Sequence, residues 1–308
     1  MTTRVSFPCM GRRAFLQAAA GATAAMAAAP DPEYPPTSRQ ELVDVNVYLS
    51  RWPFRRYAGD EPAALVASLK QHGVVQAWAG SFDGLLHKDM AGVNGRLAEE
   101  CRRHGPGLLV PLGSVNPLLP EWPEDLRRCA EVHRMPGIRL HPSYHGYGLD
   151  HPEFARLLEL AAQRKLVVQL AVIMEDERMM HPLMRVPPVN LAPLAALVKK
   201  LPGLRLVLLN AMRTVREPAL ASLVRAGQVY VEIAMLEGVG GLERLAAALP
   251  AERILFGSFS PMFYFEAAAG KLQESELPPH QRRAIATENA RALLGRPADS
   301  AAGTAEPQ

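Results

Sequence analysis

Cysteine is scarce in this chain, with three among 308 residues, and this excludes a fold held together by a dense disulfide framework. Cys101 and Cys129 both fall in segments with helical spacing of apolar residues. Two interpretations of this pair remain open, a disulfide in an oxidising compartment or two buried free thiols. The absence of a larger cysteine set favours free thiols.

Long apolar runs and blocks of one charge are also missing. The alanine-rich stretch 14–29 is shorter than the roughly 18 apolar residues that a transmembrane helix needs, and no later segment qualifies. The 34 basic and 31 acidic residues are interspersed, without a basic block. We therefore expect no membrane span in the mature protein and no nucleic-acid partner.

The first 29 residues have the pattern of a twin-arginine signal peptide. Arg12 and Arg13 directly precede the apolar stretch, and the small residues 27–29 suit cleavage by signal peptidase. Loss of the three arginines in this segment would leave equal numbers of basic and acidic residues. We expect the twin-arginine export machinery as a partner and a periplasmic or extracellular mature protein.

Residues 41–296 alternate between two patterns, after a proline-rich linker (30–40) and before a tail predicted to be disordered (297–308). Nearly continuous apolar runs are typical of parallel strands buried on both faces, and they occupy 42–47, 75–79, 108–112, 137–140, 166–172, 204–209, 229–233 and 254–256. Helical patterns follow them at 61–71, 93–104, 124–133, 152–164, 192–200, 218–225, 242–249 and 280–294.

Eight strand–helix units in order predict an α/β fold, a single-domain (β/α)8 TIM barrel. A doubly wound sheet is the alternative, but no Gly-x-Gly-x-x-Gly motif follows the first strand.

Four spaced segments carry a resemblance to a known family: GIRLHP (137–142), LPGLRLVLLN (201–210), ILFGSFSP (254–261) and TENARALLG (287–295). In their order and spacing the chain resembles the amidohydrolase-related (amidohydrolase 2) family of TIM barrels, which includes aminocarboxymuconate semialdehyde decarboxylase. The resemblance extends from about residue 42 to residue 295. It implies a site at the C-terminal ends of the barrel strands.

The same resemblance assigns the family's metal ligands to residues that bind metals poorly. Its two strand-1 histidines fall on Asn46 and Tyr48, and its strand-5 histidine falls near Ala171. Its strand-6 histidine falls on Asn210, and its strand-8 aspartate falls on Phe259. Because zinc in proteins is held by Cys, His and carboxylates, we expect no metal and no other cofactor at this site.

Polar side chains nevertheless follow most of the predicted strands, where a barrel carries its active site. The catalytic candidates are His141 as proton shuttle, Glu175 or Asp176 as the base that activates water, and Arg178 as a carboxylate clamp. The candidates for ligand contact are Asn46, Tyr48, Arg51, Trp52, Tyr144, His145, His181 and Asn210. Each also has a structural interpretation, as an ion-paired surface charge or a buried, hydrogen-bonded side chain.

Three functions remain open. The first is a metal-independent, lactonase-like hydrolase acting on a small carboxylate-bearing molecule, and the second is a non-catalytic pseudoenzyme that binds a small ligand. The third and weaker one is a decarboxylase or hydrolase with a relocated metal site built from His141, His145, Glu175, Asp176 and His181. Covalent catalysis has no support, since Ser258 lacks the Gly-x-Ser-x-Gly motif. Oligomeric state is open, with a homodimer as one option.

Overall fold

The computed structural model describes residues 40–295. The predicted signal peptide (1–29), the tail (297–308) and all of the linker except Gln40 lie outside the described residues. Within the described part of the chain, no helix is long and apolar enough to cross a membrane.

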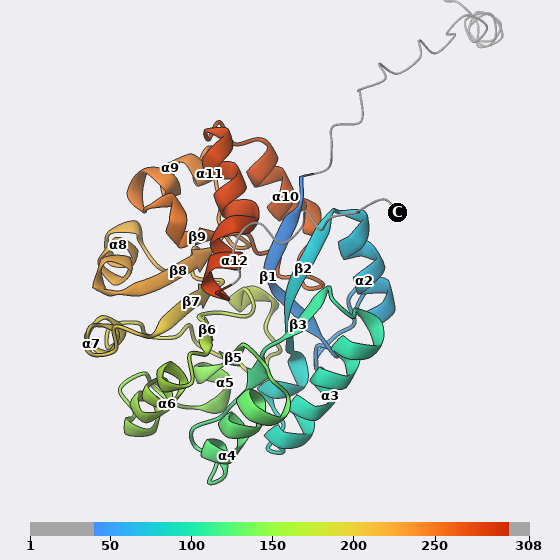
Figure 1. Cartoon of the computed structure of the whole chain (residues 1–308), viewed down its shortest axis with the longest axis vertical. Helices are drawn as coiled ribbons and strands as arrows, with labels where there is room; N and C mark the ends of the chain where they lie inside the picture. The colour runs from blue at the N-terminus through green and yellow to red at the C-terminus, as the bar shows by residue number, and fades with distance from the viewer. Residues whose placement is uncertain (1–39, 296–308) are drawn as a thin grey trace, which may run out of the picture. The chain divides into compact units, whose positions relative to one another are not determined.

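Parallel strands form a ring at the centre of the fold, and helices surround it (Figure 1). In chain order the strands are β1 (Leu42–Leu49), β2 (Val74–Ser81), β3 (Leu109–Pro111), β4 (Gly113–Ser114), β5 (Gly137–Leu140), β6 (Val167–Ala171), β7 (Arg205–Leu209), β8 (Gln228–Glu232) and β9 (Ile254–Leu255). β3 and β4 are two parts of one barrel strand, separated by Leu112, whose N–H donates to Ala79 O. The eight predicted strands are therefore all present.

Backbone hydrogen bonds between the first and last strands close the ring. Val45 N–H donates to Phe256 O at 3.0 Å, and Phe259 N–H donates to Asn46 O at 2.8 Å. Tyr48 N–H donates to Ser260 O at 2.9 Å. Because every other neighbouring pair is parallel, the sheet closes as a (β/α)8 TIM barrel, and the predicted fold class is confirmed.

The helices of the outer layer are α2 (Pro62–Gln71), α3 (Met90–His104), α4 (Trp122–Arg127), α6 (Pro152–Gln163), α7 (Leu194–Lys200), α8 (Glu217–Ala226), α9 (Gly241–Ala248), α10 (Phe265–Gln273) and α11 (Pro279–Arg283). Helix α12 (Asn289–Leu293) lies across one end of the ring, where Ala290 and Leu293 pack with the barrel interior (Figure 1). A π-helical turn, 284–288, separates α11 from α12 inside the segment predicted as one helix. The sequence patterns missed α10 and the short α5 (Pro142–His145), which follows β5 directly.

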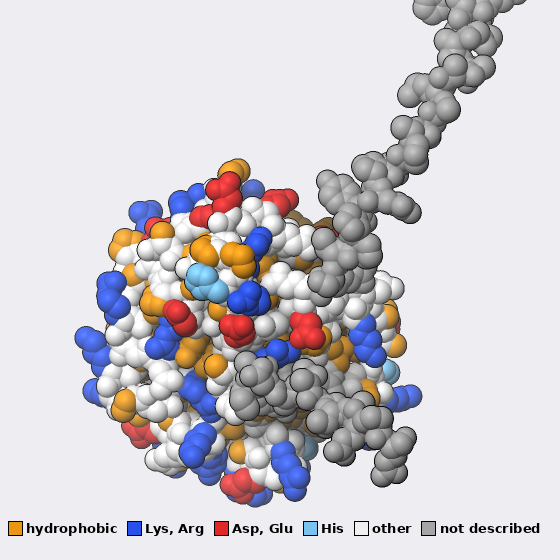
Figure 2. All heavy atoms as spheres, turned by 45° about the horizontal axis from the view of Figure 1, so that its top comes forward, with side chains coloured by type: hydrophobic (Ala, Val, Ile, Leu, Met, Phe, Trp, Pro, Cys, Tyr) orange, Lys and Arg blue, Asp and Glu red, His pale blue; other side chains and the backbone are white. Residues whose placement is uncertain are grey.

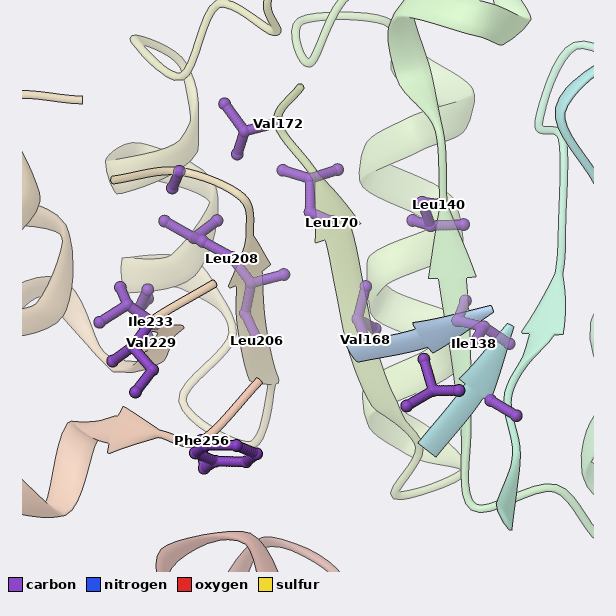
Figure 3. Close-up of a cluster of buried hydrophobic side chains, with 14 of the residues drawn as sticks. Ile138, Leu140, Val168, Leu170, Val172, Leu206, Leu208, Val229, Ile233 and Phe256 are labelled. Atoms are coloured by element: carbon purple, nitrogen blue, oxygen red, sulfur yellow. The ribbon is translucent and has the colours of Figure 1, made fainter. Parts of the chain in front are cut away.

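Side chains alternate between two cores because successive residues of a strand face opposite sides. In β6, Val168 and Leu170 pack with the helix layer, and Figure 3 draws them beside neighbours from β5 and β7. Val167 faces the barrel interior, where it joins Trp78 and Val207. The other interior positions of the strands therefore face into the barrel. We call the C-terminal ends of the strands, with the loops that follow them, the mouth of the barrel.

Cys101 and Cys129 are both buried free thiols, so the interpretation favoured by the sequence is confirmed. Burial in apolar surroundings raises the pKa of each thiol to about 12.

Candidate functional site at the barrel mouth

A fully buried arginine ties the strands together below the mouth. Arg139 of β5 donates from Nε to Gln169 Oε1 at 2.7 Å and from Nη1 to Val47 O at 2.8 Å. Its Nη2 donates to Val45 O at 3.2 Å and to Trp78 O at 2.9 Å. The carbonyls of β1 can accept these bonds because the pairing of β1 with β2 shifts register between Asp44 and Val47.

A buried carboxylate network lies beside this arginine. Glu232, at the end of β8, accepts from the backbone N–H groups of Asn210 and Ala234. Its Oε1 also lies 3.4 Å from Asn46 Nδ2, which donates to Asn210 Oδ1 at 2.9 Å. The network therefore links β1 to the ends of β7 and β8. Burial raises the pKa of Glu232 to about 7, although the two backbone N–H groups oppose that rise.

A second buried carboxylate, Asp44 of β1, holds the loop after β9 in place. It accepts from the backbone N–H groups of Asn46 and Ser258, both at 3.0 Å, and from the Ser258 hydroxyl. Burial raises its pKa to about 6, against the opposing effects of Ser258, Asn46 and the nearby charge of Arg139.

Tyr48 and His141 form a buried pair at the mouth. The Tyr48 hydroxyl lies 3.0 Å from His141 Nε2, and the Tyr48 ring stacks on Phe82 with centroids 4.6 Å apart. The Arg139 guanidinium lies 4.3 Å from the centre of the same ring. Burial, with a contribution from His145, holds the pKa of His141 well below its ordinary value, so its imidazole is neutral at pH 7.

Apolar and aromatic side chains, including that of Tyr48, fill the mouth. We call this cluster the mouth plug; its buried members are Tyr48, Trp52, Phe82, Leu85, Ala171, Met174, Ala234, Met235, Phe259 and Met262. The cavity that reaches His141 through the plug has a volume of about 10 Å³. Since one water needs about 10–15 Å³, His141 has room beside it for a single water and not for a substrate.

Two loops meet over the plug. Arg55, in the loop after β1, donates to Glu175 Oε1 and to Met179 O, both in the loop after β6. The Phe54 ring stacks on His181 of the same β6 loop, with centroids 5.5 Å apart. The Glu175 side chain is only 3% exposed, so this ion pair is a partly buried latch between the loops.

The predicted catalytic residues have separate partners. His141 contacts Tyr48, and Glu175 pairs with Arg55. Asp176 accepts from Arg178, and Arg213 approaches the same carboxylate at 2.5 Å. The two arginines, with Arg178 as the larger cause, hold the pKa of Asp176 well below its usual range. A carboxylate with that pKa is a weak base.

The predicted ligand-contact residues also lie in different places. Trp52 belongs to the plug, and Tyr144 packs at its edge. Arg51 pairs with Glu61 on the surface, and His145 Nε2 lies 2.8 Å from Gly84 O. The remaining four, Asn46, Tyr48, His181 and Asn210, lie at the mouth in the contacts given above.

The sequence patterns did not select the charged residues that organise the site, Asp44, Arg55, Arg139, Arg213 and Glu232. For Asp44, Arg139 and Glu232 the available signal was a charge inside a strand predicted to be buried on both faces, which requires a partner. Arg55 and Arg213 lie on loops and had no such signal.

The chemistry of the donor set does not fit a metal. The five positions that the resemblance assigns to metal ligands do gather at the mouth. Asn46 bonds Asn210 there, while Tyr48, Ala171 and Phe259 pack in the plug. Among the described residues no group of three or more His, Cys, Asp or Glu side chains is placed to hold a metal ion. The relocated set built around His141 and Asp176 is therefore not formed.

Comparison with known proteins identifies the family. A putative amidohydrolase from Staphylococcus aureus is similar in structure at 14% identity and a TM-score of 0.63, covering 83% of this chain and 99% of that one. The 5-carboxyvanillate decarboxylase from Sphingomonas paucimobilis is similar at 13% identity and a TM-score of 0.65, with coverage of 83% and 99%. A dihydroxybenzoic acid decarboxylase from Polaromonas sp. JS666, solved with bound manganese, is similar at 13% identity and a TM-score of 0.62, with coverage of 83% and 97%.

These identities show a shared fold. No curated protein matches the chain. The sequence model of the family described as Amidohydrolase matches residues 40–296, nearly the whole of the barrel, and the chain therefore belongs to that amidohydrolase family.

Proposed function

We propose that this protein is a non-catalytic member of its family, which binds a ligand at the barrel face where its enzymatic relatives react. The observation that carries the proposal is the mouth plug. Its aromatic and methionine side chains fill the mouth, and the cavity that reaches His141 has a volume of about 10 Å³.

The candidate acids and bases support the same proposal. His141 is neutral and buried, Asp176 is paired with two arginines, and Glu175 is paired with Arg55. General acid–base catalysis needs a group with a pKa near the working pH within reach of the substrate. The pKa values of His141 and Asp176 are held well below their usual ranges, and Arg55 occupies the Glu175 carboxylate, whose pKa burial raises. Glu232 has a pKa of about 7, but three hydrogen bonds inside the barrel hold its carboxylate.

The distribution of exposed apolar side chains supports binding at this face. Of the nine large apolar residues that are exposed among residues 40–295, seven lie on loops that follow barrel strands: Leu86, Leu118, Met179, Leu183, Val239, Phe263 and Tyr264. Leu183, Val239 and Tyr264 are 91%, 98% and 82% exposed. Exposed apolar surface that concentrates on one face is typical of a binding site.

The basic and acidic residues of the chain are interspersed, which favours a small or mixed-charge ligand over a polyanion. Figure 2 presents the side of the barrel that carries α12, away from the mouth, and basic and acidic side chains are interspersed with apolar ones there too. We also propose export through the twin-arginine pathway, on the basis of Arg12, Arg13 and the apolar segment after them.

A metal-free hydrolase or decarboxylase is the second candidate. It is supported by the Tyr48–His141 pair at the mouth, and by the decarboxylases among the structures of similar fold. In that case the loops joined by Arg55 and Glu175 would have to separate, because the substrate must reach His141.

Metal content and turnover of the purified full chain test the proposal together. Protein from cells supplied with manganese, zinc and iron should carry far less than one metal per chain, and it should leave a panel of lactones and aromatic carboxylates unchanged. A variant with Asn46→His, Tyr48→His, Asn210→His and Phe259→Asp restores the ligand types and serves as the positive control for metal uptake. Stoichiometric metal in the natural chain, or turnover that His141→Gln abolishes, would refute the proposal.

A further inference from the structure

A surface groove lies beside the plug, where the loops after β6 and β7 meet. Its volume is about 610 Å³, within the range of about 300–1,000 Å³ typical of small-molecule sites. The polar part of its lining consists of Asp176, Glu177, Arg178, Arg185, Arg213 and Thr214. The apolar part of its lining consists of Ile173, Met180, Val186, Pro187 and Pro188.

The charged lining contains three arginines and two carboxylates. Asp176 occupies part of the guanidinium groups of Arg178 and Arg213, and the exposed Glu237, outside the lining, lies 3.8 Å from Arg213 Nε. Arg185 has a weaker partner, since its Nη1 lies 3.5 Å from Glu177 Oε1 and both side chains are well exposed. Each guanidinium carries five N–H groups, so donors remain for an incoming anion, and exposed ion pairs of this kind compete weakly.

The apolar part of the lining continues toward His141. Ile173, Met180, Val186 and Pro187 line both the groove and the small cavity that ends at His141. A ligand with its anionic group at Arg185 and Arg213 would therefore place its apolar part against Val186 and Pro187.

We propose that this groove binds an amphiphilic carboxylate, a molecule with one carboxylate head and an unbranched apolar chain. The proposal deepens the proposed function, because it names the ligand class of the binding face, and it requires no chemistry at His141. Arg213 and Arg185 hold the carboxylate, and the Val186–Pro188 segment removes the chain from water.

Isothermal titration of the full chain with three probes of equal chain length tests this. Octanoate should bind, octan-1-ol should bind about tenfold more weakly because it lacks the charge, and octylamine should give no measurable binding. Arg213→Gln should weaken octanoate by about tenfold and leave octanol unchanged. Arg185→Gln, on an exposed side chain, should act in the same direction without disturbing the fold.

Arg216→Gln is the matched control, since Arg216 lies on the same loop as Arg213 but outside the groove. Val186→Asp should abolish binding of both octanoate and octanol. Equal affinities for octanoate and octanol, no octanoate binding, or an equal loss in the Arg216 and Arg213 variants would overturn the groove proposal. Conversion of bound octanoate to a product, followed by chromatography, would overturn the non-catalytic function and leave the binding site intact.

Discussion

Replacement of Arg139 should destabilise the barrel more than replacement of any exposed arginine. In Arg139→Met the Gln169 side chain and the carbonyls of Val45, Val47 and Trp78 lose the donors that Arg139 provides. Gln169 Nε2 still donates to Val45 O at 2.7 Å, so that carbonyl keeps one partner.

The expected loss of stability follows from the three acceptors that lose their Arg139 donor, Gln169 Oε1, Val47 O and Trp78 O. Each buried polar group without a partner costs about 1–3 kcal/mol, and the lost desolvation penalty of the guanidinium offsets part of the sum. We therefore expect a loss of about 3–5 kcal/mol in the free energy of unfolding. Such a loss is a large share of the roughly 5–15 kcal/mol that stabilises an ordinary domain.

The loss of stability should also depend on pH, because the buried charge of Arg139 acts on the buried carboxyl group of Asp44. Its charge opposes the rise that burial causes in the pKa of Asp44, now about 6. Without Arg139 that pKa rises further, and ionised Asp44 becomes more costly. The destabilisation by Arg139→Met should therefore be larger at pH 8 than at pH 5. Arg139→Lys keeps the charge but cannot reach four acceptors, so it should lose stability with little added pH dependence.

Urea denaturation at the two pH values measures both effects. The control is Arg156→Met, since Arg156 also lies over an aromatic ring, Trp122, but is 57% exposed and should change stability by less than about 0.5 kcal/mol. A loss below about 1 kcal/mol in Arg139→Met would refute the role of the arginine as a link between strands. A loss that is equal at pH 5 and pH 8 would refute its coupling to Asp44.

Three further predictions concern other buried residues. The pKa of Glu232 is raised from 4.5 to about 7, so this residue favours folding while it is protonated. The free energy of unfolding should therefore fall as the pH rises from about 4.5 to 7. Glu232→Gln should remove about 3 kcal/mol of that pH dependence in the same denaturation series. Gly80→Ala places a Cβ 2.7 Å from Arg139 Nη1 and should cost about 1–3 kcal/mol, whereas Gly95→Ala, with open space around it, should be neutral or stabilising by calorimetry. Ellman's reagent should label Cys101 and Cys129 only under denaturing conditions, because both thiols are buried and protonated; rapid labelling of native protein would contradict the packing.

The strands could be predicted from the sequence because parallel strands covered on both faces leave continuous apolar runs. Helix α10 was missed although Phe265, Ala268, Ala269 and Leu272 have helical spacing, since alanine gives a weak contrast between its buried and exposed faces. The role of Asp176 could not be predicted, because one of its two arginine partners, Arg213, lies 37 residues further along the chain.

The closure of the ring of strands also explains why the hydrogen bonds of Arg139 could not be predicted from the sequence. Arg139 stands inside the predicted strand 137–140, and a charge there signals that a partner exists. Three of its four acceptors, however, are backbone carbonyls of β1 and β2, which become available only when the ring closes and β1 shifts register. Local patterns carry no information about either event.

The amide network suggests how the barrel closes with Asn46 and Asn210 at positions to which the resemblance assigns metal ligands. A metal held by several strands cross-links them as well as activating water. In this chain Asn46 Nδ2 bonds Asn210 Oδ1, and Glu232 accepts from the Asn210 backbone, so hydrogen bonds link β1, β7 and β8 without an ion. Such bonds maintain the closure of the ring but supply no Lewis acid. Because these two roles are separate, the barrel can retain its fold while its mouth serves the binding function proposed above.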